Sequence, residues 1–141
     1  MKRIGWLFLA IVISMQSAFG KVLLVKQSGS GSASALANDI ELAISEWFFE
    51  KGILALSEQN PIDQVGIELA QYMAQQMGAS AFILWNVRSN GDFLLMMYTI
   101  NGQLIGEVKE SLNVRDTATL SRLMKRLDPF LTEQTRTLGL G

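Results

Sequence analysis

The first stretch whose residue types could bind a ligand is a loop of small residues. It contains Gly29, Ser30, Gly31 and Ser32, between an apolar run predicted to be a strand and a segment predicted to be a helix. Glycine-rich turns at helix N-termini hold phosphates, because their backbone N–H groups point at the anion. However, Ser34 stands where the dinucleotide fingerprint needs a third glycine, and the lysine of a P-loop is absent. We interpret the loop as a flexible connection, with small-ligand or anion binding as the alternative.

Catalytic side chains are scarce in this chain. It has no histidine and no cysteine, which removes the commonest general base, the usual zinc ligands and the thiol nucleophile. Carboxylate pairs occur at Glu46 and Glu50 and at Glu107 and Glu110. A glycosidase needs two carboxylates across a cleft, whereas all four of these fall on positions predicted to face solvent. The sequence predicts no catalytic residue, no metal site and no cofactor, and therefore a protein that is not an enzyme.

Aromatic side chains are the candidates for protein binding. Trp47, Phe48 and Phe49 follow one another on a predicted helix, where neighbours are about 100° apart. They cannot all point into a core, so at least one should lie near the rim of the buried face. An exposed aromatic ring is a typical anchor for a partner, and Trp85 has a polar neighbour in Asn86. We predict Trp47, Phe48, Phe49 and Trp85 as candidate partner-binding residues, although core packing is the default for each ring.

The N-terminal segment predicts export. Residues 1–3 form a basic start, residues 4–15 are an apolar run, and Ala18 and Gly20 are small residues at the positions that a signal peptidase reads. The run is shorter than the roughly 20 residues that span a bilayer. We expect a signal peptide at 1–20, cleaved after Gly20. Because the chain has no cysteine, no lipid can be attached to one, and we expect a periplasmic protein of a Gram-negative bacterium.

The expected mature chain is a single, mildly acidic domain. Removing the segment leaves 141 − 20 = 121 residues, with 12 − 2 = 10 basic residues against 13 acidic ones. This balance argues against nucleic-acid binding, and no further stretch is long enough to span a membrane. We predict one α/β domain at 21–134 and a flexible tail at 135–141.

Residues 81–113 are the stretch around which the other elements are arranged. Apolar runs at 81–88, 93–100 and 103–113 are separated by Asn90-Gly91 and Asn101-Gly102. Asn-Gly between apolar runs favours a type I′ hairpin turn, so we predict an antiparallel three-strand meander. Its middle strand is apolar on both faces, as a central strand should be. The third strand alternates polar and apolar side chains toward its end, which predicts one face in contact with water.

The preceding segment is expected to contribute two strands and two helices. Strands are predicted at 21–25 and 53–56, and a helix at 35–51 between them. A second helix should be capped by Asn60, begin at Pro61 and end at Gly78.

The last helix should follow the meander. Asp116 or Thr117 is expected to cap it, and Pro129 should kink it or end it near Leu127. The predicted order is β-α-β-α-β-β-β-α, an α/β (α+β) fold with a mixed sheet.

The chain resembles a group of bacterial envelope domains. The motifs are Leu-Ala-Asn-Asp-Ile at 36–40, Met-Gly-Ala-Ser-Ala-Phe-Ile-Leu at 77–84 and Tyr-Thr-Ile-Asn-Gly-Gln-Leu-Ile at 98–105. They are similar to the TolB amino-terminal domain, LpoB and CsgG, where a helix ends in Gly-Ala-Asp and a later hairpin carries Asp-x-x-Gly-x-x-Leu. The resemblance implies an anticodon-binding-like fold and a non-enzymatic role. The chain departs from the group in having no lipid-bearing cysteine and no room for a propeller or membrane-spanning strands.

These observations predict an accessory or scaffold protein of a cell-envelope machine, such as flagellar, secretion, pilus or cell-wall assembly. We expect it to bind an envelope complex or to self-assemble. The first strand, or the polar third strand of the meander, would accept a strand from the partner.

Overall fold

The computed structural model describes residues 20–27, 34–58 and 66–140. Within them the element order is that predicted, and it confirms a mixed α/β fold. The strands, written in chain order, are β1 (Gly20–Lys26), β2 (Ile53–Glu58), β3 (Ala81–Val87), β4 (Asp92–Thr99) and β5 (Leu104–Ser111). The helices are α2 (Ser34–Glu50), α3 (Ile67–Gln76) and α4 (Thr119–Thr137).

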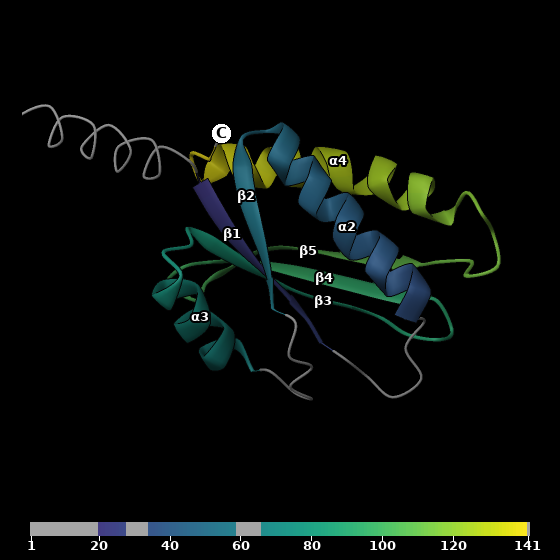
Figure 1. Cartoon of the computed structure of the whole chain (residues 1–141), viewed down its shortest axis with the longest axis horizontal. Helices are drawn as coiled ribbons and strands as arrows, with labels where there is room; N and C mark the ends of the chain where they lie inside the picture. The colour runs from purple at the N-terminus through teal and green to yellow at the C-terminus, as the bar shows by residue number, and fades with distance from the viewer. Residues whose placement is uncertain (1–19, 28–33, 59–65, 141) are drawn as a thin grey trace, which may run out of the picture.

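The strands form one sheet in the order β2-β1-β3-β4-β5 (Figure 1). β1 pairs in parallel with β2 and β3, because α2 and α3 supply the crossovers that parallel neighbours require. β3, β4 and β5 form the predicted antiparallel meander. β1 therefore lies inside the sheet, so the prediction that the first strand accepts a partner strand is wrong. The third strand of the meander, β5, is the last strand in the sheet order, so the prediction that it accepts a partner strand remains open.

The hairpin turns differ in detail from the predicted type. The Gly91 N–H donates to the Arg88 carbonyl at 2.9 Å, and the Gly102 N–H donates to the Thr99 carbonyl at 2.9 Å. Each glycine has a positive φ, 97° and 87° respectively. This is the pattern of a three-residue loop, a turn followed by a left-handed glycine, rather than a two-residue type I′ loop. At Gly91 an added Cβ would lie 1.9 Å from the Leu112 carbonyl oxygen, so no side chain fits.

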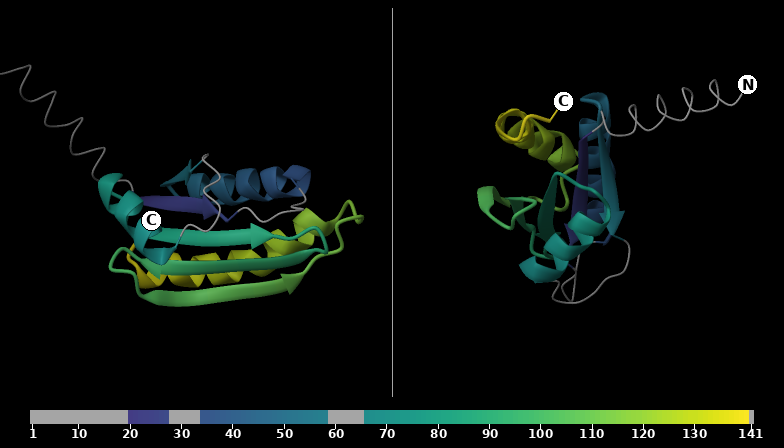
Figure 2. Two further views of the ribbon diagram at one scale, coloured as in Figure 1. Left: turned by 90° about the horizontal axis from the view of Figure 1, so that it is seen from below. Right: turned by 90° about the vertical axis from the view of Figure 1, so that its left-hand side faces the viewer.

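The helices cover the two faces of the sheet unequally. α2 and α4 lie side by side on one face, which we call the helix face, and α3 packs against β1 and β3 on the other, which we call the open face (Figure 1). Viewed from the open face, β5 and the end of β4 that lies away from α3 have α4 behind them and no described helix in front (Figure 2, left). The larger core fills the helix face.

The ends of α3 and α4 correct the sequence predictions. α3 begins at Ile67, after Gly66 in extended conformation, and not at Pro61; Asn60 and Pro61 lie outside the described residues. The residue before α4 is Ala118, so neither Asp116 nor Thr117 is the cap. Asp116 instead accepts a hydrogen bond from the Ala118 N–H at 2.9 Å.

Pro129 does not end α4. The helix continues to Thr137, because Leu123, Leu127, Leu131 and Thr135 form one buried row across the proline. The carbonyl that loses its N–H partner belongs to the exposed Lys125 and can be hydrated. The predicted boundary before residue 135 thus falls inside a packed helix, and Leu138 and Leu140 also contact the core.

Candidate functional site

The open face of β3, β4 and β5 carries three cross-strand rows of side chains. Strand register places Leu84, Met96 and Glu107 in one row and Asn86, Leu94 and Lys109 in the next. The third row, at the end of the sheet, consists of Arg88, Asp92 and Ser111. Side chains that share a row across antiparallel strands lie close enough to interact. The first two rows join polar and apolar groups, and the third row is polar throughout.

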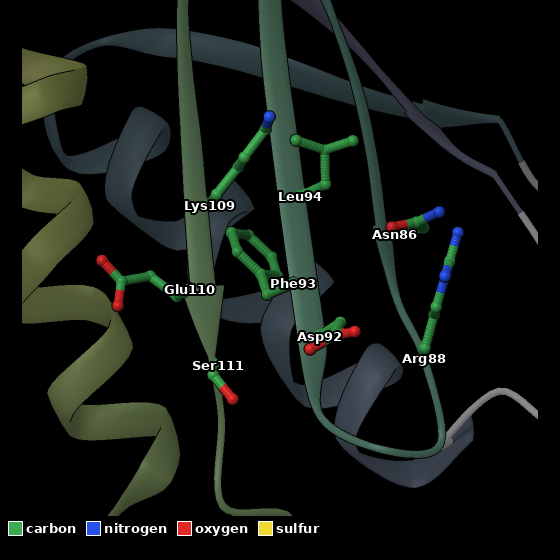
Figure 3. Close-up of a pocket in the computed structure, with 8 residues that line it drawn as sticks. All are labelled: Asn86, Arg88, Asp92, Phe93, Leu94, Lys109, Glu110 and Ser111. Atoms are coloured by element: carbon green, nitrogen blue, oxygen red, sulfur yellow. The ribbon is translucent and has the colours of Figure 1, made fainter.

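A pocket of about 440 Å³ lies at this end of the sheet (Figure 3). It is lined by Asn86, Arg88, Asp92, Phe93, Leu94, Lys109, Glu110 and Ser111. Asp92 is held by the hairpin, since the Asn90 side-chain amide donates to its carboxylate at 3.0 Å. Leu94 lies between Asn86 and Lys109, and Glu110 points toward α4. The pocket combines an apolar floor with mixed charges, which suits a polar surface contact.

Glu107 and Lys109 are the charged pair on β5. Lys109 Nζ lies 3.7 Å from Glu107 Oε1. The Lys109 side chain is 73% exposed and the Glu107 side chain is 44% exposed. A pair this exposed and this long contributes little to folding stability. Both charges are therefore free to exchange this contact for one with a partner.

Burial raises the pKa of Tyr98, and the Glu107 carboxylate raises it further. The Tyr98 ring stacks on Phe82 with centroids 5.0 Å apart, and its hydroxyl donates to the Met96 sulfur at 3.5 Å. The ring belongs to the smaller core beneath α3. The phenol thus stays neutral at physiological pH and marks the border between the covered and uncovered parts of the open face.

On the helix face the second β5 carboxylate has a structural role. Glu110 accepts hydrogen bonds from the Arg126 guanidinium of α4, with distances of 2.8 Å from Nε and 2.7 Å from Nη2. It therefore joins β5 to α4. Glu107 and Glu110 leave opposite faces of the strand, so they do not form a pair across a cleft.

The predicted aromatic site is mostly core. Trp47, Phe48 and Trp85 are buried in the helix-face cluster, which overturns their assignment as exposed partner-binding residues. The Trp47 ring contacts Phe48 edge-on, and its Nε1–H donates to Asp128 of α4 at 2.7 Å. Helix geometry explains the outcome, because consecutive residues rotate by about 100° and Phe49 alone is turned outward, with 75% of its surface exposed.

Trp85 packs toward Phe93 on the helix face, and its buried Nε1–H has no hydrogen-bond partner among the described residues. Its polar neighbour Asn86 suggested exposure, yet in a strand neighbours point to opposite faces. Because side chains alternate along β3, Trp85 points into the helix-face core and Asn86 points to the open face.

The alternative anion-binding residues Gly29, Ser30, Gly31 and Ser32 lie outside the described residues. Within the described ranges, no group of three or more acidic side chains is placed to hold a metal ion. Nor does any helix in that part of the chain have the length and apolarity to cross a membrane.

Sequence reasoning did not identify the row Asn86, Leu94 and Lys109. The alternation of Glu107, Lys109 and Ser111 predicted a wet face on β5, but local periodicity does not report how far a short helix extends over the neighbouring strands. Strand order, which sets that coverage, depends on contacts distant in sequence.

Comparison with known proteins gives little further guidance. No family model and no curated protein matches the chain. Among solved structures, the PelC dodecamer from Paraburkholderia phytofirmans is similar, with 13% identity over 78% of this chain and 88% of that chain and a TM-score of 0.47. A likeness at this level assigns neither family nor function, which must be inferred from the residues of the chain itself.

Proposed function

We propose that this protein is a non-enzymatic accessory or scaffold domain of the bacterial cell envelope, one that docks to, or assembles within, an envelope machine. The observation that carries the proposal is the unequal covering of the sheet. Two helices cover one face, whereas on the open face α3 covers only one part, and β4 and the edge strand β5 present Leu94, Glu107 and Lys109 on the part that no described helix covers. The predicted signal peptide and the resemblance to the TolB, LpoB and CsgG group support an envelope location.

A second exposed surface lies on α2. Leu42 and Phe49 are seven residues apart, so they share one side of the helix, and they are 60% and 75% exposed. Solvent-exposed leucine and phenylalanine on one helical side are suited to a hydrophobic contact. We assign Phe49 as the anchor of this surface.

The test is crosslinking of the tagged full chain in cells, followed by mass spectrometry of the captured proteins. One dominant envelope complex, or a ladder of self-crosslinks, is the expected result. Recovery of an uncrosslinked monomer alone would contradict the scaffold role and favour ligand binding.

Phe49→Asp sharpens this experiment. It should reduce capture severalfold while leaving the folded state intact, because the ring makes little contact with the core. Tyr72→Asp is the matched control, since Tyr72 is an exposed ring, 59% accessible, on α3 and not on α2. Equal loss of capture in both variants would show that Phe49 is not a specific anchor.

A further inference from the structure

The backbone of β5 has hydrogen-bonding groups that no described strand uses. β5 is the last strand in the sheet order, with β4 on one side only. The Leu112 N–H donates to the Gly91 carbonyl at 2.7 Å, toward the β4 side. Because backbone groups alternate in direction along a strand, those of Glu107 and Lys109 point away from β4. An approaching antiparallel strand would therefore pair first with these two residues.

The side chains around Val108 are self-complementary. If two β5 strands meet about a two-fold axis at Val108, Glu107 of each faces Lys109 of the other, on the open face. Moving the axis to Glu107 or to Lys109 places a charge opposite its own copy, and like charges directly opposite are destabilising. With the two-fold axis at Val108, the exposed charges of one β5 strand therefore attract those of the other.

The helix-face positions fit the same register. Glu110 faces Gly106, which has no side chain to collide with the carboxylate held by Arg126. Gly106 itself lies under α4, where an added Cβ would be 2.7 Å from the Phe130 ring. Val108 faces Val108 of the second copy, so the axis passes through an apolar contact.

We propose that a second copy of this chain occupies the β5 edge, antiparallel and centred on Val108, so that the two sheets join into one. This deepens the proposed function, on which it rests, by naming the partner strand as the same strand. An edge lysine normally discourages strand addition. In the register centred on Val108, Lys109 favours strand addition instead, because Glu107 of the second copy neutralises its charge. The charge pattern therefore selects its own copy and rejects unrelated strands.

Charge exchange tests the register. The purified full chain should show a concentration-dependent dimer in sedimentation equilibrium. Glu107→Lys or Lys109→Glu alone should weaken it by roughly tenfold or more, since both symmetric pairs become repulsive. The double variant Glu107→Lys/Lys109→Glu should restore dimerisation, and an equimolar mixture of the two single variants should form a heterodimer. Glu46→Lys, the same charge change at an exposed position of α2, is the control and should leave the dimer unchanged.

A cysteine at the axis provides a second readout. The chain has no native cysteine, and Val108→Cys places two thiols opposite one another. In a non-hydrogen-bonded pair the Cα atoms are about 4.5 Å apart, within the range that a disulfide spans. Oxidation should give a covalent dimer, whereas Ser89→Cys at the hairpin tip should not.

A monomeric full chain, or a dimer that neither single charge variant weakens, would overturn the β5 pairing. The in-cell crosslinking separates this failure from failure of the proposed function. A monomer that still captures an envelope complex retains the docking role. A charge-sensitive dimer that captures no envelope protein retains the pairing and loses the docking role.

Discussion

Neighbouring residues of β4 lie in two different environments. Phe93, Leu95 and Met97 point to the helix face and are almost fully buried, whereas Leu94 and Met96 point to the open face and are half-buried. The strand is apolar on both sides, so residue type alone does not separate them. What separates them is the placement of the covering helices, because α4 packs against β5 on the helix face, whereas α3 packs mainly against β1 and β3 on the open face. An apolar residue next to an uncovered edge is therefore available for contact with another molecule.

The largest expected difference between a buried and an exposed neighbour is on α2, at Phe48 and Phe49. Phe48→Asp should destabilise the fold by about 4 kcal/mol or more, because it places a charge in the helix-face core. Phe49→Asp should change the free energy of unfolding by about 0.5 kcal/mol or less, as an exposed substitution. Urea unfolding followed by circular dichroism measures both. Similar midpoints for the two variants would show that the two rings share one environment.

A second pair makes the same comparison within β4. Phe93→Ala should cost about 3–5 kcal/mol, since it opens a cavity beneath Trp85 and α4. Leu94→Ala should cost about 1 kcal/mol, because part of the side chain is already in water. Equal losses in urea unfolding would mean that the open face is covered in solution, for example by a second molecule.

Much of the helix face was predictable, and the open face was not. Ile40 and Ile44 are four residues apart in α2, a spacing that predicts one buried face, and both lie in the core. The two Asn-Gly sequences located the meander. Pro129 suggested an early helix end, but the buried row that continues beyond it overrides local propensity. The assignment of Trp85 failed because its burial depends on a helix more than thirty residues further along the chain.

A third prediction concerns the hairpin that ends the open face. Gly91→Ala should destabilise the protein by about 2–3 kcal/mol, since the residue has φ 97° and its Cβ would collide with the Leu112 carbonyl. Gly52→Ala is the matched control, with φ 77° and no atom within 4 Å of the added Cβ. It should cost about 1 kcal/mol, from backbone conformation alone. Equal losses in thermal unfolding would show that the collision with the Leu112 carbonyl does not contribute to the destabilisation.

The smallest effect is a pH dependence that distinguishes the two β5 carboxylates. The folded-state pKa of Tyr98 lies above its unfolded value of 10.0, first through burial and then through Glu107. The stabilisation is therefore fully present below about pH 10 and is lost as pH rises through the folded-state pKa, because the unfolded phenol ionises first. In a Tyr72→Phe background, Tyr98 is the remaining tyrosine, and ultraviolet absorbance of the phenolate reports its titration. Glu107→Gln should lower this pKa, whereas Glu110→Gln should leave it unchanged, since that carboxylate lies on the helix face with Arg126. Equal shifts from the two substitutions would contradict the separation of the two faces at β5.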